Sequence, residues 1–143
     1  MIKFYKISTI EKLAPYVDAV AGANVANYAG GSVTAGVFAV AAKGAFYVAQ
    51  VEKGDDAFVA PYTIAKDDHV RLVDLTKIVG EQVLISPSSY TGTISVGNKL
   101  AFNASGILAA GTPSSGDVYF SVDKINVDFD GAGILATVAV QGA

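Results

Sequence analysis

The sequence predicts a mainly β fold: a compact antiparallel β-barrel or sandwich with many short strands and at most one or two short helices. Three observations support this prediction. Apolar and polar residues alternate with a period of two, the alternation returns after roughly eight to twelve residues, and Gly, Pro, Asn and Asp gather between the alternating segments. This pattern is typical of an all-β domain, because a strand with one buried face alternates and the turns between strands favour these residues.

The clearest strands lie in the last third of the chain. We expect a strand over Lys99–Phe102, a four-residue turn over Asn103–Gly106 and a second strand from Ile107. The alternation of the next strand changes parity around Asp123–Lys124, which predicts a β-bulge or a bend there. A turn over Asp130–Gly133 then leads into the last alternating segment, so we predict a hairpin between the last two strands.

Further strands are expected earlier in the chain. The segments "VFAVAA" and "AFYVAQV" flank Lys43–Gly44, and we predict that they form a hairpin. The segments "HVRLVDL" and "QVLI" read as strands, and the segment "AFVAPYTIA" reads as an edge or interrupted strand because Pro61 lacks an N–H for a ladder.

Helix is scarce. Two short candidates are Ser8–Val20, where Ser8 or Thr9 is a suitable cap and Pro15 interrupts, and Leu75–Glu81, ended by Gly80. At 143 residues the chain fits one β-rich domain. The Gly/Ala-rich region Ala14–Gly36 is the one marked shift in composition. We interpret residues 1–36 as an N-terminal arm or an Ala/Gly-rich packing lobe of that domain.

Charge and composition argue against several classes of partner. The net charge is −3 and no basic, aromatic-interleaved stripe is present, so we expect no nucleic-acid binding. The uncharged segment Ala19–Ala42 is long enough for a membrane span but is diluted by Asn, Ser, Thr and Gly, so we expect no membrane insertion. The first residues lack the apolar run of a signal peptide, which predicts synthesis in the cytoplasm. There is no Cys, which excludes disulfides and thiolate chemistry.

Residues with catalytic potential do not form a recognisable motif. His69 is the one histidine and follows Asp67 and Asp68, but a Ser-His-Asp triad with Ser86, Ser88 or Ser89 lacks a nucleophile elbow, and a solvated histidine at a strand edge is the better interpretation. We therefore expect no enzyme activity.

Candidate cofactor and metal motifs fail on context. Gly131–Ala136 matches a relaxed dinucleotide fingerprint, yet a strand rather than a helix is expected after it. Asp123, Asp128 and Asp130 lack the spacing of a calcium loop, and solvated turn acids are the better interpretation. The seven tyrosines suit a carbohydrate groove, but packing with a wet hydroxyl edge is more common, and there is no Trp. We expect no cofactor and no metal.

The segment "TISVGNKLAFNASGILAAG", followed by "VYFSVDKINVDFDGAGILATVAV", resembles the C-terminal half of the capsid decoration, or cement, proteins of tailed bacteriophages. The residues that carry the resemblance are Val96–Leu100, Asn103–Gly106 and Ile134–Val140, which match a V-G-[DN]-K-L hairpin, an N-x-x-G turn and a final alternating strand. The strand region "HVRLVDLTKIVGEQVLIS" also resembles the one that leads into this hairpin. The similarity spans about Asp67 to Val140.

This resemblance implies a structural virion protein without an active site. Such a protein binds the outer surface of an assembled capsid, often as a homotrimer, and stabilises the shell by bridging subunits of the major capsid protein. Other interpretations are a β-sandwich adhesion or carbohydrate-binding module, another virion component such as a tail-tube or head-fibre subunit, and a hydrolase that uses His69.

The residues expected at the capsid or subunit interface are Ile2, Phe4, Tyr5, Ile7 and Tyr90. The segment Met1–Thr9 alternates apolar and charged residues, which suits addition of a strand to a partner's sheet. The alternative is an ordinary first strand of the barrel. The loops Ser86–Gly92 and Gly111–Asp117 are the next candidate attachment surfaces.

Overall fold

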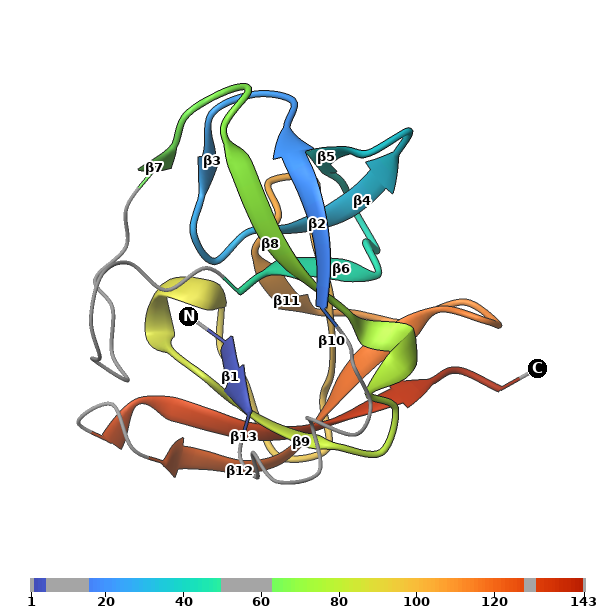
Figure 1. Ribbon diagram of the computed structural model, residues 1–143. Helices are drawn as coiled ribbons and strands as arrows, with labels where there is room; N and C mark the ends of the chain where they lie inside the picture. Colours follow the sequence, from blue (N-terminus) through green and yellow to red (C-terminus); the bar gives the residue numbers. More distant parts are fainter. Residues whose placement is uncertain (1, 5–15, 50–62, 128–130, 143) are drawn as a thin grey trace.

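Strands dominate the fold, as the sequence predicts. The computed structural model describes residues 2–4, 16–49, 63–127 and 131–142 (Figure 1). For residues 3 and 4 it describes only the backbone. It is 53% strand and 6% helical, with no helix of seven or more residues in the part described. The strands form a small closed barrel, a larger sheet and a short strand pair, which confirms the predicted mainly β class.

The closed barrel lies in the upper part of Figure 1 and has the strand order β2-β5-β4-β6-β8. Its strands are β2 (Tyr16–Ala21), β4 (Gly30–Thr34), β5 (Val37–Val40), β6 (Phe46–Val48) and β8 (His69–Asp74). β2 and β5 pair in parallel, whereas the other pairs are antiparallel. A separate pair, β3 (Val25–Ala26) with β7 (Thr63–Ile64), packs with the barrel core through its buried residues Val25 and Ile64.

The larger sheet is antiparallel and has the order β1-β9-β13-β12-β10-β11. Its strands are β1 (Ile2–Phe4), β9 (Gln82–Ile85), β10 (Lys99–Phe102), β11 (Leu108–Ala110), β12 (Val118–Val127) and β13 (Gly133–Val140). Two 3-10 turns, η1 (Leu75–Lys77) and η2 (Pro87–Ser89), lie on either side of β9.

One core cluster joins the sheet to the end of the barrel. It combines Tyr47 and Val73 of the barrel with inward side chains of the sheet, among them Leu100, Phe102 and Phe120. The rings of Phe102 and Phe120 meet edge to face, with centroids 6.0 Å apart, a favourable arrangement for aromatic pairs. The barrel and the sheet therefore share apolar surface.

The predictions for the C-terminal third are confirmed. β10, the turn Asn103–Gly106 and β11 lie as expected, and β12 pairs with β13 as an antiparallel hairpin. The register of that hairpin shifts between Val122 and Lys124, where the parity of the sequence changes. The expected turn residue Asp130 is outside the described residues.

The predicted hairpin at Lys43–Gly44 is wrong, although both of its strands exist. β5 and β6 do not pair with each other, because β4 lies between them and bonds to both. Gly44 packs so closely on Gly31 that a Cβ at Gly44 would lie 2.2 Å from the Gly31 carbonyl oxygen. The chain at Lys43–Gly44 thus crosses over β4 instead of reversing beside β5.

The helix predictions are also corrected. Tyr16–Val20, the described part of the segment Ser8–Val20, is strand β2, whose side chains alternate between solvent and the barrel core. Of Leu75–Glu81, only η1 is helical, and Asp74 caps it by accepting a hydrogen bond from the Thr76 N–H at 3.0 Å. Antiparallel pairing with the neighbouring strand β8 outweighs the helix signals in the sequence before β2.

The N-terminal third contributes strands to both parts of the fold. Residues 16–36 supply β2, β3 and β4, so their small residues lie in the barrel and its neighbouring strand pair. Ile2–Phe4 forms β1, which pairs with β9, and the Ile2 side chain is buried in the shared core. Ile2–Phe4 is therefore a first strand, as in the alternative interpretation, but it belongs to the six-stranded sheet and not to the closed barrel. Pro61 and Ser8 lie outside the described residues.

The turn Asn103–Gly106 docks the sheet onto the barrel. The Asn103 side-chain oxygen accepts hydrogen bonds from the N–H groups of Ser105 and Ile107, at 2.9 and 3.1 Å. Gly106 has φ of 77°, a conformation that favours glycine, and its carbonyl accepts a hydrogen bond of 2.9 Å from the Gly30 N–H of β4. A Cβ on Gly30 would lie 2.2 Å from the Phe102 ring, so only glycine allows this approach.

This close approach predicts that Gly30→Ala is strongly destabilising. The added methyl group has to displace the Phe102 ring from the shared core, and overpacking of this kind costs about 1–3 kcal/mol. Gly111→Ala is the matched control because a Cβ at Gly111 meets nothing within 4 Å. Chemical denaturation measures both; equal stability of the two variants would show that the junction can relax.

Tyr47 places a polar group without a hydrogen bond in the apolar core. Its ring is fully buried, and its hydroxyl group is the one buried side-chain polar atom without a hydrogen bond in the described part of the chain. Burial, and then the neighbouring Tyr16, raise the pKa of the Tyr47 hydroxyl far above its usual range. The hydroxyl group is therefore neutral. Burial removes its hydrogen bonds to water, and no hydrogen bond within the described part of the chain replaces them.

We predict that Tyr47→Phe leaves the protein as stable as before or stabilises it by about 1 kcal/mol, because the substitution removes an unsatisfied polar atom and no hydrogen bond. Thermal unfolding of the two proteins measures the difference. Destabilisation of more than about 1 kcal/mol would reveal a hydrogen bond to this hydroxyl in solution.

Candidate interaction surface

The predicted interface residues do not form one exposed surface. Ile2 is buried in the shared core, and Phe4 lies in β1 opposite Val83. Tyr5 and Ile7 are outside the described residues. Tyr90 is half-buried against the shared core, and its hydroxyl donates a hydrogen bond of 2.8 Å to the Ala132 carbonyl. Among the predicted interface residues, the structure describes the side chains of Ile2 and Tyr90, and of these two only Tyr90 reaches the surface.

Tyr90 lines a small surface pocket of about 100 Å³ at the end of the β12–β13 hairpin. The pocket also contains Ile94, Ile125 and Asn126. Asn126 has φ of 57° and lies beside the second register shift of the hairpin, so the irregular strand shapes this wall. The loop Ser86–Gly92 thus contributes Tyr90 to a small concave surface whose exposed lining is mostly polar.

Close to this pocket in sequence, the V-G-N-K-L motif forms a tight turn that presents Val96 to solvent. The Asn98 N–H donates to the Ser95 carbonyl at 3.1 Å, and the Asn98 side-chain oxygen accepts from the Ser95 N–H at 2.9 Å. Gly97 has φ of 90°, which a residue with a side chain rarely adopts. Val96 is 62% exposed, the highest value among the large apolar residues described.

Hydrogen bonds to β12 hold this turn in place. The Gly97 N–H donates to the Val122 carbonyl at 2.9 Å, and the Val122 N–H donates to the Asn98 carbonyl at 3.0 Å. An apolar side chain on a turn whose backbone is already bonded to a strand loses little conformational freedom when a partner covers it. Val96 is therefore suited to contact an apolar surface on another molecule.

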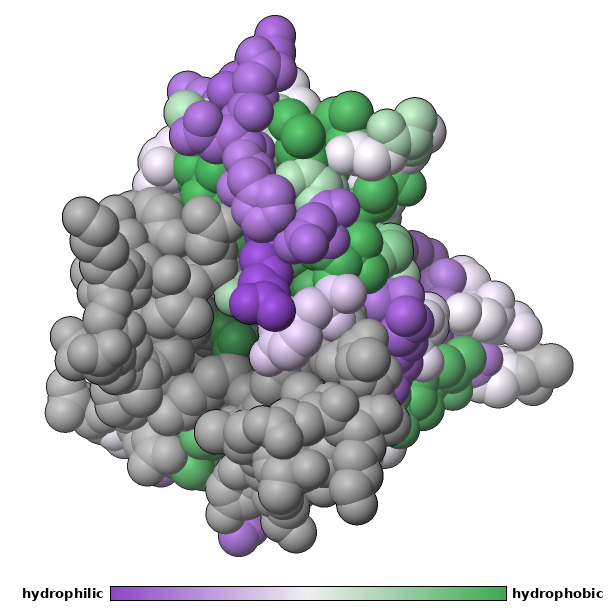
Figure 2. Space-filling model, viewed as in Figure 1, coloured by the Kyte–Doolittle hydropathy of each residue, from purple (hydrophilic) through white to green (hydrophobic). Residues whose placement is uncertain are grey.

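The outer face of the barrel carries polar pairs that the sequence analysis missed. Figure 2 shows a hydrophilic ridge down the face of β8 and β2, bordered by apolar residues. The Arg71 guanidinium lies 4.3 Å from the centroid of the Tyr16 ring, and His69 Nε2 lies 3.0 Å from Asp18 Oδ1. Both pairs join residues about fifty positions apart, so only the β2–β8 register brings them together.

The contacts of His69 and of the serines bear on the Ser-His-Asp triad. His69 contacts Asp18, with both side chains mostly exposed, whereas the Ser86 hydroxyl contacts those of Ser88 and Ser89 at 2.9 and 3.4 Å. His69 lies on the barrel and the serines lie beside β9 of the sheet. The described contacts do not join the histidine to a serine.

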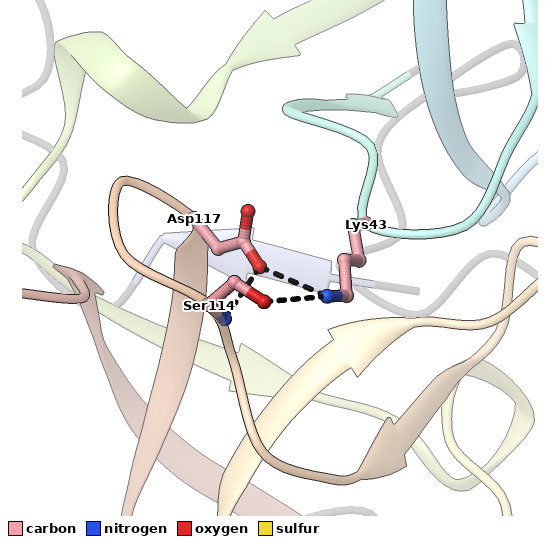
Figure 3. Close-up of polar contacts among 3 residues, drawn as sticks. All are labelled: Lys43, Ser114 and Asp117. Atoms are coloured by element: carbon pink, nitrogen blue, oxygen red, sulfur yellow. Dashed lines mark hydrogen bonds and ion pairs between the residues drawn. The ribbon is translucent and has the colours of Figure 1, made fainter.

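A second polar cluster contains Lys43, Ser114 and Asp117 (Figure 3). The Lys43 ammonium group donates to Ser114 Oγ at 3.2 Å and lies 3.2 Å from Asp117 Oδ2. The cluster connects the segment after β5 to the loop Gly111–Asp117, and so ties the barrel to the sheet.

The remaining sequence motifs have structural roles. Gly133–Val140 is a strand, so the dinucleotide fingerprint leads into no helix. Asp123 accepts hydrogen bonds from Thr137 at 2.5 Å and from Gln82 at 3.3 Å across three adjacent strands. Within the described ranges, no three acidic or histidine side chains are grouped to hold a metal, and no helix there is long and apolar enough to cross a membrane.

A scan against protein-family models, a search of curated proteins and a search of solved structures each found no match to this chain.

The Lys43–Asp117 pair predicts a pH dependence. The Ser114 N–H, and then Lys43, hold the pKa of the Asp117 carboxyl below its usual range. A lowered folded-state pKa stabilises the fold above the unfolded pKa of about 3.9, and this stabilisation is lost as the pH falls through the folded pKa. We expect Asp117→Asn to lower the melting temperature at pH 7 and to leave it unchanged at about pH 2.

Asp68→Asn, a substitution at an exposed position before β8, serves as the control and should have little effect at either pH. Melting curves across the pH range provide the measurement. A deficit of the Asp117 variant that persists in acid would assign its role to packing instead of charge.

Proposed function

We propose that this chain is a structural virion protein that binds the outer surface of an assembled phage capsid and stabilises it by bridging subunits of the major capsid protein, as a homotrimer. The observation that carries the proposal is the V-G-N-K-L motif. The residues that resemble those of cement proteins form a turn, bonded to Val122 of β12, that exposes Val96. The N-x-x-G turn of the same resemblance is the junction between barrel and sheet.

The proposed mechanism is burial of apolar surface, without chemical catalysis. Covering an exposed Val side chain stabilises a complex by about 1.5–3 kcal/mol. One such contact is weak, but a trimer that engages several coat subunits repeats it, and linked contacts increase affinity through effective concentration. The bridging of subunits then resists their separation.

The two-part fold suits a protein that has to withstand mechanical force without deforming. The barrel and the sheet share one core and are connected by main-chain hydrogen bonds at Gly30 and Lys43, the second from the Lys43 N–H to the Phe102 carbonyl at 2.8 Å. Interiors packed in this way deform little. A rigid body transmits force between the subunits that it contacts.

The test uses shells assembled from the major capsid protein of the genome that encodes this chain. We expect the protein to co-sediment with these shells and Val96→Ser to weaken binding roughly ten- to a hundredfold, since one buried apolar contact is lost. Val79→Ser is the matched control because Val79 is also exposed, at 47%, but lies between η1 and β9.

Melting temperatures of both variants should equal that of the parent protein, because neither side chain is buried. Failure of the parent protein to bind the shells at micromolar concentration would overturn the proposed function. Binding of a glycan array instead would favour the adhesion module. Equal binding by the Val96 and Val79 variants would move the contact away from this turn.

A further inference from the structure

A carboxylate, a hydroxyl group and an amide meet on one face of the six-stranded sheet. Asp123 lies on β12, Thr137 on β13 and Gln82 on β9, and these strands are adjacent in the order β9-β13-β12. Their chain neighbours Val122 and Ala136 belong to the shared core, and successive residues of a strand point to opposite faces. The three polar side chains therefore project from the face opposite the shared core.

The strand register brings these side chains together. Thr137 and Gln82 are direct partners in the β13–β9 pair, and direct partners lie side by side with Cβ atoms about 5 Å apart. The register shift in the β12–β13 hairpin leaves Asp123 without a partner of its own on β13. A bulge of this kind re-aims a side chain, and here the Asp123 carboxylate reaches both Thr137 and Gln82.

Both donors bond to the same carboxylate oxygen. The Thr137 hydroxyl group donates to Asp123 Oδ2 at 2.5 Å, and the Gln82 side-chain amide donates to the same atom at 3.3 Å. All three side chains are only partly exposed. Because the hydroxyl proton points at the carboxylate, the lone pairs of Thr137 Oγ1 face away from Asp123 and are available to the neighbouring amide.

This arrangement contains the groups that an acyl transfer needs. A threonine hydroxyl becomes a nucleophile when an adjacent general base takes its proton, and the base has to lie within hydrogen-bond distance of that proton. Asp123 Oδ2 meets this condition. The acyl group is the side-chain carbonyl of Gln82, and its leaving nitrogen, Nε2, already bonds to the same carboxylate oxygen.

We propose that Thr137 and Gln82 form an intramolecular ester cross-link between β13 and β9, with Asp123 as the general base. Thr137 Oγ1 attacks Gln82 Cδ and gives its proton to Asp123 Oδ2. The Oγ1–Cδ bond forms and the Cδ–Nε2 bond breaks, while Asp123 passes the proton on to Nε2, which leaves as ammonia. The reaction consumes no other reactant and releases one ammonia molecule per chain.

Two features favour the cross-link over hydrolysis of the amide. Strand pairing holds the hydroxyl group beside the amide, and such positioning raises the effective concentration of a reactant by several orders of magnitude. The released ammonia is diluted and takes up a proton at neutral pH, so it does not attack the ester in return. The new bond then closes the chain between β9 and β13 into a loop, which restricts the unfolded state and prevents these two strands from separating under force.

The intact mass of the purified, folded full chain tests the proposal. We expect the mass to be lower than that of the sequence by one ammonia molecule. In a proteolytic digest, the peptides that contain Gln82 and Thr137 should stay joined. A parent protein that keeps the full mass of its sequence would overturn the proposal, and this measurement decides it even where a variant fails to fold.

Substitutions separate the roles of the three groups. Thr137→Val removes the nucleophile and should keep the full mass, whereas Thr137→Ser retains a hydroxyl group and should still lose ammonia. Asp123→Asn should lose ammonia about a hundredfold more slowly, because the general base is missing. Ser121→Ala is the matched control, since Ser121 is the partner of Thr137 on β12 and should not affect the loss.

Two further outcomes would contradict the proposal. Loss of ammonia that persists in Thr137→Val would place its source elsewhere in the chain and overturn the cross-link. Equal rates of loss in Asp123→Asn and in the parent protein would overturn the role of Asp123 as the base. All of these measurements use the isolated protein, so their results do not depend on whether it binds capsids.

Discussion

The fold depends on one close approach between two backbones, where the turn Asn103–Gly106 meets β4 at Gly30. The turn is closed by its own Asn103 side chain, and Gly106 then accepts the hydrogen bond of Gly30. The ring of Phe102 covers the same glycine, at a distance that leaves no room for a Cβ. Without this contact, the sheet and the barrel would each expose an apolar face that the shared core now buries.

Polar contacts add to this junction but do not create it. Lys43 lies at the crossing between β5 and β6, where its N–H donates to Phe102 and its ammonium group reaches Asp117. Its side chain is about half exposed, so water screens the ion pair and its contribution is small. The apolar core sets the stability of the junction, whereas the ion pair fixes the position of the loop Gly111–Asp117.

The sequence was sufficient where strands that are neighbours in the chain are also neighbours in the sheet. The pairs β10–β11 and β12–β13 are hairpins, so alternation and turn residues identify both the strands and their partners. The bulge near Asp123 could also be predicted, because an extra residue shifts the parity of the apolar positions. Local patterns determine these features almost completely.

Partner choice in the barrel is not a local property. The alternation around Lys43 indicates two strands, but β4, which is earlier in the chain, occupies the place between them. The cap residues predict a helix over Ser8–Val20, but pairing with β8 decides the conformation of its described part, Tyr16–Val20. The contacts of Asp18 with His69 and of Tyr16 with Arg71 follow from that register, so no sequence pattern reveals them.

The candidate surface at Val96 was partly readable from the chain. An apolar residue followed by glycine within a tight turn, as at Val96–Gly97, has no strand face on which to be buried, and this signal points to an exposed side chain. The Asp123 site had no such signal, because Gln82 and Thr137 read as ordinary polar positions of strands. Only the strand order β9-β13-β12 brings both side chains to one carboxylate.

The Val96 turn is tied to the junction at Gly30 through β10. This strand leads directly from the turn into the turn Asn103–Gly106, where the Gly106 carbonyl accepts the hydrogen bond of the Gly30 N–H. The Val96 turn also bonds to Val122 of β12, a strand of the same sheet. Val96 therefore lies on a turn that is fixed to the sheet and, through the junction, to the barrel, so a contact made at Val96 is held at one position relative to both parts of the fold.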